Sequence, residues 1–380
     1  MDFQLDPDIQ TATDSFRRYL LRDVAPLAVE YRDRVMPAEV VRAHLKALRP
    51  FGLISGWTRP EHGGQGVDYM TSGLMYEQLA RVFPDLAGTA FIAEAAGVIL
   101  SELGSQEVRE KYLQKVLDGE MLGCMAITEP GAGSNPREVR AKAVQEGKGW
   151  RISGSKAWIS NGGVSDFCIV VARTGDNSFT RFLVDRKEHG YRSSEIKKMG
   201  LTAWSTAEMY FDDVWVPNEN IVGGLHEGLK STMLGFQRGR VFMALIALAI
   251  CEESLDAATT YARERTQFEV AIASHQLVQD MIAEIATLTE TTRLLTYKAL
   301  QRLSLGLPNR LESAMAKQYA VESAAKAAAL AMSVHGANGI AVEFPVERHL
   351  RNARMLIVPD GTTQVNRLIM GRELLGVSAL

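Results

Sequence analysis

The spacing of apolar residues changes twice along this chain, and this change constrains the fold more than any other feature. In residues 8–33 the apolar positions recur three or four apart, as in an amphipathic helix: Phe16, Leu20, Val24 and Leu27. Residues 121–235 carry short segments of alternating apolar and polar residues, such as WRISG and TRFLVDR, separated by turn residues. The helical spacing then returns in long segments. The sequence predicts the order helical, β, helical.

Three regions follow from this pattern. We expect a helical N-terminal domain over residues 1–120, an antiparallel β-domain over 121–235, and a C-terminal four-helix bundle over 236–380, an α+β protein. The bundle is indicated by long helical segments with short connections: 240–265, 275–305 and an Ala-rich segment that stops at Gly336.

Composition excludes several classes of protein. With 380 residues, 46% apolar and 23% charged, the chain matches a soluble globular protein with two or three cores. A net charge of −3 leaves no basic excess for a nucleic-acid backbone, so no nucleic-acid partner is expected.

Location and metal binding are also bounded by the sequence. The start MDFQLDPD is acidic and lacks an apolar leader, which predicts a cytoplasmic protein. The apolar run 241–251 is short of the roughly 20 residues that cross a bilayer, so we expect a buried helix and no membrane partner. Cys124, Cys168 and Cys251 lie far apart without ligand spacing, so we expect no metal site and three buried thiols.

A lone carboxylate stands in the segment PDGTTQ, residues 359–364. Pro-Asp-Gly is ordinary turn chemistry, in which proline fixes φ and glycine adopts positive φ. By that reading Asp360 is a turn residue and no more. The alternative is a catalytic carboxylate, and the rest of the chain decides between the two.

Five motifs bear on that choice: MAITEPGAGSN (125–135), SGSKAWISNG (153–162), RERTQF with HQ (263–276), VHGANGI with PVERHLRNAR (334–354) and PDGTTQ (359–364). In their order and spacing they resemble the acyl-CoA dehydrogenase family across nearly the whole chain. The resemblance implies an FAD enzyme that removes an α-proton and a β-hydride from an acyl-CoA. It also implies a homotetramer, a dimer of dimers, that passes electrons to an electron-transferring flavoprotein.

The resemblance assigns roles to residues of these motifs. Thr128 would bond the polar edge of the flavin, Trp158 would cover one face, Ser160 would offer its hydroxyl to N5, and Arg265 would pair with the pyrophosphate of a neighbouring subunit. The full set of implied cofactor residues is Met125, Ile127, Thr128, Trp158, Ser160, Arg265, Phe268, Gln276, Gly336, Thr362 and Gln364. The implied substrate residues are Ser134, Gln237, Arg240 and Gly361.

Each of these residues also has a plainer interpretation. Arg265 fits a solvated helix face, and Gly336 fits a helix stop. The GAGSNP loop lacks the third glycine of the dinucleotide fingerprint and precedes strands, so a nicotinamide-binding fold is disfavoured.

The chain departs from the family pattern at several positions. Asn135 and Pro136 stand where aspartate is usual after GAGS, Ser333 replaces a glutamine, and Asn352 replaces a frequent aspartate. The resemblance therefore does not decide whether these positions contact the cofactor.

The base is the most informative departure. Most relatives carry glutamate where Asp360 stands, and a minority carry it on the first bundle helix, where this chain has Gly239. The resemblance therefore implies that Asp360 is the α-proton base, and we expect it to be isolated from charged partners in an apolar channel. Aspartate is shorter by one methylene, about 1.5 Å. Because dehydrogenases of ring thioesters share this aspartate, we expect a branched or alicyclic acyl-CoA, with cyclohexane- or cyclohexene-carboxyl-CoA as the first choice.

Two other functions stay open at this point. One is a relative that acts on a carrier-protein-bound acyl group, or on another carbon acid as nitroalkane oxidases do. The other is an inactive relative that holds FAD as a structural module. The chemically competent side chains of Thr128, Trp158, Ser160 and Asp360 disfavour the second.

Overall fold

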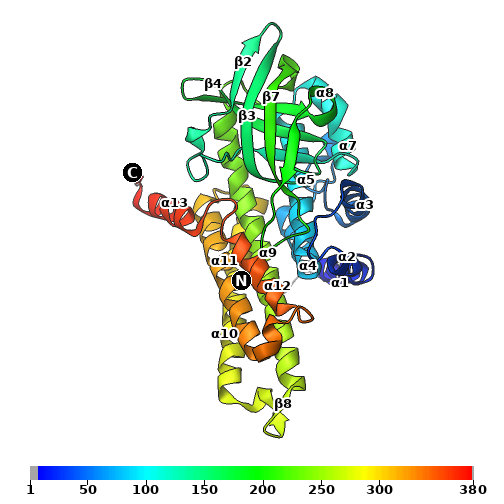
Figure 1. Cartoon of the computed structure of the whole chain (residues 1–380), viewed down its shortest axis with the longest axis vertical. Coiled ribbons are helices and arrows are strands. Elements are labelled where there is room, and N and C mark those ends of the chain that lie inside the picture. Colours follow the sequence, from blue (N-terminus) through cyan, green and yellow to red (C-terminus); the bar gives the residue numbers. More distant parts are fainter. Residues whose placement is uncertain (1–6, 379–380) are drawn as a thin grey trace.

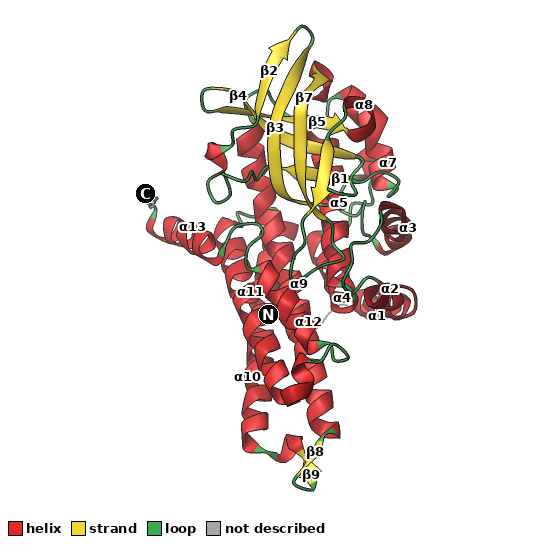
Figure 2. Cartoon of the chain, viewed as in Figure 1, coloured by secondary structure: helices red, strands yellow, loops and turns green. Residues whose placement is uncertain are grey.

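The computed structural model describes residues 7–378 and has two parts (Figure 1). A β-sheet with flanking helices occupies one end of the long axis, and a bundle of long helices extends from it to the other end (Figure 2). The order helical, β, helical is as predicted. The first six residues of the acidic start MDFQLDPD lie outside the described part of the chain.

The N-terminal region is helical, as its apolar spacing indicates. Asp68 caps α4 by accepting hydrogen bonds from the amides of Met70 and Thr71, at 2.9 and 3.1 Å. The helices of this region are α1 (Pro7–Tyr19), α2 (Ala25–Glu30), α3 (Ala38–Leu48), α4 (Tyr69–Val82), α5 (Pro84–Leu103), α6 (Gln106–Val108) and α7 (Gln114–Leu117).

Helix α5 is the one described helix that is long and apolar enough to cross a membrane. In this fold 83% of its most apolar window is buried inside the protein. That burial makes α5 a core helix here, packed between the sheet and the bundle.

The middle region forms a seven-stranded sheet in which antiparallel pairs dominate. Strand β1 is the main exception, because it pairs with β4 in parallel and so makes the sheet mixed. The strands are β1 (Gly123–Ala126), β2 (Lys142–Glu146), β3 (Gly149–Ser160), β4 (Phe167–Gly175), β5 (Ser178–Asp185), β6 (Arg192–Glu195) and β7 (Thr206–Pro217), with the short helix α8 (Arg186–His189) after β5.

The C-terminal region is the helical bundle. Helix α9 runs from the sheet to the far end of the molecule (Figure 1), and its apolar run 241–251 is buried, as expected. All three cysteines are buried and free. The elements are α9 (Gly228–Glu264), the hairpin strands β8 (Thr266–Gln267) and β9 (Val270–Ala271), α10 (Gln276–Ser304), α11 (Arg310–His335), α12 (Val346–Leu356) and α13 (Thr363–Leu375).

Candidate active site

Asp360 lies in the tight turn between α12 and α13. Its φ is +54°, and Gly361 follows at +97°, the positive value expected for that glycine. Aspartate tolerates the left-handed region better than most residues. Thr362 then caps α13 by accepting a hydrogen bond from the Val365 amide at 3.3 Å.

The Asp360 carboxylate lies against helix α9 at Gly239. A Cβ added to Gly239 would stand 2.7 Å from Asp360 Oδ2 and 3.0 Å from its Cγ. The two positions that the resemblance offers for a base are thus neighbours in space, and the missing side chain at one admits the carboxylate of the other. Arg240, the next residue on α9, donates from Nε to the Asp360 carbonyl at 3.3 Å.

Asp360 is not electrostatically isolated, which corrects the expectation from sequence. Burial raises the pKa of its carboxyl, while the positive charges of Lys317 and Arg240 oppose that rise. Lys317 comes from α11 and Arg240 from α9, both far away in sequence. The local segment carries no cation, so a reading of that segment alone misses both.

Lys317 holds the turn that carries Asp360. Its side chain is fully buried, and Nζ donates to the carbonyls of Ile357 and Gly361 at 2.9 and 2.7 Å. Asn366 donates to the Gly361 carbonyl as well, at 2.8 Å. Burial lowers the pKa of Lys317 to about 8, against the opposing pull of Asp360.

The β-domain contributes a second group of residues, on β1, β3 and the loop after β1. The Ala157 amide donates to the Thr128 carbonyl at 2.9 Å, which joins the ITEPGAGS loop to the KAWIS segment. Beneath them Lys156 is fully buried and pairs with Glu129 at 2.9 Å. Lys156 also donates to the Ile127 carbonyl at 3.0 Å, so one ammonium group holds both segments.

Trp158 is presented to solvent by an irregularity in β3. The register with β7 shifts between Lys156 and Ile159, and Trp158 has a φ of +61°. Such bulges re-aim a side chain, often beside active sites. The indole is 60% exposed, which is unusual for tryptophan. An exposed flat ring next to the Thr128 loop suits stacking of a planar group.

The remaining predicted residues of this region lie at the surface or at element ends. Ser134 is exposed in the GAGS loop, Ser160 closes β3, and Gln364 is exposed in the first turn of α13. Met125 is part-buried within β1. Ile127 directly follows that strand and is also part-buried. Gln237 is part-buried one turn before Arg240 on α9.

The departures from the family pattern have local partners. Asn135 accepts from the Arg137 amide and donates to Glu138. Asn352 is buried and accepts from the Leu201 amide at 2.7 Å. Ser333 is exposed and donates back to the Ala329 carbonyl. The first two therefore have structural roles within the chain.

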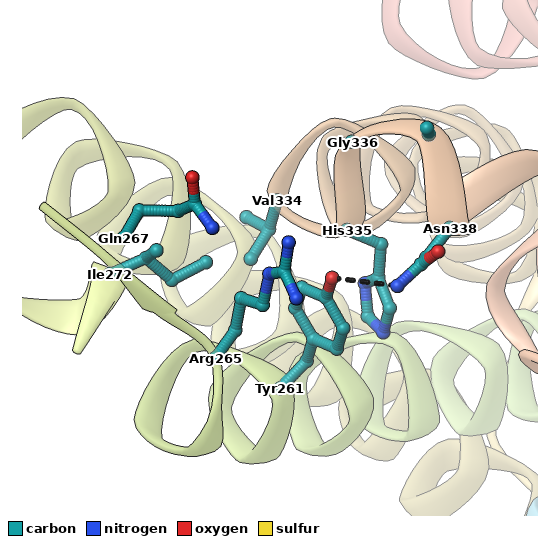
Figure 3. Close-up of a pocket in the computed structure, with 9 residues that line it drawn as sticks. Tyr261, Arg265, Gln267, Ile272, Val334, His335, Gly336 and Asn338 are labelled. Carbon is teal, nitrogen blue, oxygen red and sulfur yellow. Dashed lines mark hydrogen bonds between the residues drawn. The ribbon is translucent and has the colours of Figure 1, made fainter.

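A third group surrounds a pocket at the far end of the bundle (Figure 3). The cavity has a volume of about 280 Å³ and is lined by Arg265 and Gly336 together with Tyr261, His335 and Asn338. Asn338 donates to the Tyr261 hydroxyl at 3.0 Å, and the Tyr261 and His335 rings stack with centroids 4.2 Å apart. The Arg265 guanidinium makes no ion pair with a described residue, and a cation beside stacked rings suits a phosphate next to an aromatic base.

Phe268 and Gln276 lie near this pocket. Phe268 is at the tip of the β8–β9 hairpin, with φ of +53° and 89% of its surface exposed. Its ring contacts His275 edge-on at 6.1 Å, and Gln276 begins α10 directly after that histidine. These two residues therefore belong with Arg265, as the motif spacing indicates.

The structure thus divides the predicted cofactor residues into two separate groups. Thr128, Trp158 and Ser160 lie at the sheet end, whereas Arg265 and Gly336 lie at the far end of the bundle. Between Gly239 and Arg265, α9 rises by about 39 Å at roughly 1.5 Å per residue. The two groups of one chain therefore lie far apart.

Three features were missed from sequence: Lys317, the Lys156–Glu129 pair, and a cluster of aromatic side chains formed by Trp57, Tyr76, Phe91 and Phe242. A signal existed for Lys317. The residues that share its helix face, three or four positions away, are Ser313, Ala314, Ala320 and Val321, and all are buried. A single lysine on an apolar helix face is costly unless it has partners.

A carboxylate held at a turn, an exposed tryptophan beside a polar loop, and a pocket with an arginine beside stacked rings are compatible with an oxidoreductase that binds a planar cofactor. Family models named acyl-CoA dehydrogenase N-terminal, middle and C-terminal domain match residues 6–120, 124–214 and 226–375. The chain belongs to the acyl-CoA dehydrogenase family, and its cofactor is FAD.

Similar proteins agree on the family and differ in substrate. Glutaryl-CoA dehydrogenase of Desulfococcus multivorans is 33% identical, over 99% of both chains. Cyclohexane-1-carbonyl-CoA dehydrogenase of Syntrophus aciditrophicus is 32% identical, over 97% of this chain and 96% of that protein. A glutaryl-CoA dehydrogenase from Mycobacterium smegmatis, solved in complex with FADH2, has a TM-score of 0.92 at 25% identity, over 99% and 96% of the chains.

Proposed function

We propose that Asp360 is the base that removes the α-proton of a branched or alicyclic acyl-CoA, with cyclohexane- or cyclohexene-carboxyl-CoA as the first choice. Bound FAD supplies the acceptor for the hydride that leaves the β-carbon. The product is the α,β-unsaturated thioester, and the α-proton passes to the Asp360 carboxylate.

The observation that carries this proposal is the contact between Asp360 and Gly239. The carboxylate occupies the space that a side chain at residue 239 would take. Aspartate has one methylene fewer than glutamate, and here its carboxylate lies against the backbone of α9. It therefore leaves more room beside the α-carbon of the substrate. A ring or a branch at the α-carbon needs that room.

We propose that an aromatic wall, which meets α9 one helical turn after Gly239, limits the length of the acyl group. We give this name to Trp57, Tyr69, Tyr76, Phe91 and Phe242. Phe242 is three positions after Gly239 on α9, so it lies about one helical turn from that glycine. Its ring stacks on Phe91 with centroids 5.3 Å apart and meets Trp57 at 4.6 Å.

Buried polar groups fix the wall in place. Glu94 on α5 accepts hydrogen bonds from the Trp57 amide at 2.9 Å and from the Tyr76 hydroxyl at 2.6 Å. The Trp57 indole donates to Ser72 Oγ at 2.7 Å. A compact acyl group therefore fits between Asp360 and the wall better than a long straight chain does.

The chain's own groups also orient the thioester. Among the described residues none accepts a hydrogen bond from the Asp360 amide. This N–H is free to donate to the thioester carbonyl, which stabilises the charge that develops there when the α-proton leaves. Ser134, Gln237, Arg240 and Gly361 are the residues we assign to holding the rest of the acyl-CoA.

We further propose that FAD is bound between two copies of this chain within a homotetramer. Thr128, Trp158 and Ser160 would hold the ring end, and Arg265, Phe268, Gln276 and Gly336 of another copy would hold the nucleotide end. The support is the separation of the two groups along α9, which a second copy would bridge. Met125, Ile127, Thr362 and Gln364 complete the proposed cofactor set.

Arg265→Ala should weaken FAD retention while the chain stays folded, because the guanidinium is exposed and makes no ion pair with a described residue. The measurement is the FAD-to-protein ratio after gel filtration, with light scattering for the oligomeric state. Arg263→Ala, an exposed arginine in the last turn of α9, is the control. A wild-type monomer saturated with FAD would contradict the shared site.

The substrate is tested by anaerobic mixing with acyl-CoAs and observation of flavin bleaching. Cyclohexane-carboxyl-CoA should bleach faster than butyryl- or octanoyl-CoA. Phe91→Leu should shift the preference towards longer straight chains, because it removes part of the wall. Phe83→Leu, a buried phenylalanine at the start of the same helix, should leave the preference unchanged.

Other results of the same experiment are equally decisive. A wild-type preference for straight chains rejects the ring substrate but not the base. Bleaching only by carrier-protein thioesters or nitroalkanes rejects acyl-CoA as the donor.

We also propose that the protein is cytoplasmic and that an electron-transferring flavoprotein accepts the electrons from the reduced flavin.

A further inference from the structure

Lys317 is a buried cation for which the proposed reaction has no direct use. Its side chain is completely buried within the bundle, on the face of α11 that packs against α9 and the Asp360 turn. Lysine is rarely buried to this extent, because the ammonium group loses its hydration. A structural or functional gain is needed to offset that cost.

The contacts of Lys317 bracket the base. Its Nζ donates to the carbonyl of Ile357, three residues before Asp360, and to that of Gly361, directly after it. Arg240 binds the Asp360 carbonyl between them, and Asn366 binds the Gly361 and Thr362 carbonyls. Four carbonyls of one short turn are thus held by three side chains.

Such a clamp is needed because the turn is strained. A residue other than glycine with positive φ is strained and persists only when its surroundings impose that conformation. Asp360 has this conformation in the turn that Lys317 holds at both ends. Loosening the turn would let the carboxylate leave Gly239.

The charge of Lys317 has a second effect. Burial raises the pKa of Asp360, which disfavours the ionised form that a base requires, and Lys317 is the larger of the two cationic influences that oppose this rise. The other charged groups around Lys317 are Arg240 on α9 and Glu322 on α11. Arg310, at the start of α11, pairs with Glu373 of α13 at 3.2 Å.

We propose that Lys317 is the positioning residue of the reaction: it fixes the Asp360 turn through the Ile357 and Gly361 carbonyls and keeps the base ionised. It touches neither substrate nor cofactor. This inference rests on the proposed role of Asp360 as base.

The test compares Lys317→Gln, Lys317→Met and Lys317→Arg with the wild-type holoenzyme. The rate of flavin reduction by cyclohexane-carboxyl-CoA is measured from acid to neutral pH. The part of the profile in which the rate rises with pH is called the acid limb. In the Gln and Met variants the midpoint of the acid limb should shift to higher pH by about one unit or more, the effect of losing an opposite charge beside a carboxyl. In the Arg variant it should stay near the wild-type position even if the rate falls.

Hydrogen exchange supplies a measurement that does not depend on activity. Amides of residues 357–362 should exchange faster in the Gln and Met variants, because the turn loses its clamp. The control is Lys326→Met, on the same helix, where the half-exposed lysine pairs with Glu284. That variant should change neither the acid limb nor the exchange of the turn.

Three outcomes separate the possibilities. An acid limb that stays at the wild-type position in both the Gln and Met variants overturns the role of Lys317. If those two variants lose FAD, an upward shift of the limb in the Arg variant overturns it as well. Asp360→Asn is measured in parallel: if that variant reduces the flavin at the wild-type rate, the base assignment fails, whatever Lys317 does.

Discussion

Asp360→Asn should bind FAD and acyl-CoA as the wild type does, yet slow flavin reduction by roughly 10²–10⁴-fold, the usual contribution of a positioned general base. The amide has the shape of the carboxylate but cannot accept the α-proton. Because asparagine also tolerates positive φ, the turn should keep its conformation. The measurement is rapid-mixing reduction of the flavin under anaerobic conditions.

The exposed Asp176→Asn in the β4–β5 turn is the matched control, and it should reduce at the wild-type rate. A second variant, Gly239→Ala, keeps the carboxylate but displaces it, since the new Cβ would lie 2.7 Å from Asp360 Oδ2. Alanine is the better helix former, so α9 itself should be preserved. Slower reduction in both variants supports the base, whereas wild-type rates in both exclude Asp360.

The direction of the pH dependence follows from burial. A base must be ionised, and burial raises the pKa of the Asp360 carboxyl above its ordinary value. The rate of flavin reduction should therefore rise with pH through a pKa higher than that of an exposed aspartate. The cations Lys317 and Arg240 limit this rise but do not cancel it.

The fold was predictable because it depends on local periodicity. Apolar spacing gave the extent of α10 well, at Gln276–Ser304 against the expected 275–305, and the end of α9 at Glu264. The start of α9 was wrong, because the helix begins at Gly228, twelve residues before the expected residue 240. The strands of the middle region also follow from alternation. The parallel pairing of β1 with β4 did not, because it joins segments about 40 residues apart and the intervening chain does not specify the pairing direction.

The site was predictable only where its residues lie together in one short sequence motif. Asp360 and Gly361 could be placed because a Pro-Asp-Gly turn has a defined backbone. The neighbours of Asp360 could not, since Gly239, Arg240 and Lys317 come from two other helices. The exposure of Trp158 depends on a register shift against β7, which the KAWIS segment alone does not reveal.

Lys156→Met should lower the free energy of unfolding by about 3–5 kcal/mol, the cost of leaving a buried charge without its partner. Lys156 is fully buried, and Glu129 opposite it also accepts hydrogen bonds from the amides of Arg140 and Ala141, at 2.8 and 2.9 Å. Because Lys156 also holds the Ile127 carbonyl, the variant should lose FAD as well as stability. Denaturant unfolding and the FAD-to-protein ratio measure the two effects.

The pH dependence of the free energy of unfolding shows whether the Lys156–Glu129 pair causes this loss of stability. Burial alone would raise the pKa of Glu129, but Lys156 and the two amides outweigh it and hold the pKa below its ordinary value. The pair therefore stabilises the wild type above the ordinary glutamate pKa, and this stability is lost as pH falls through the folded-state pKa. Lys156→Met should lose that dependence, and Lys156→Met with Glu129→Gln should recover part of the free energy. Lys142→Met, at an exposed position on β2, is the control; equal stability of the two lysine variants would exclude a structural role for the ion pair.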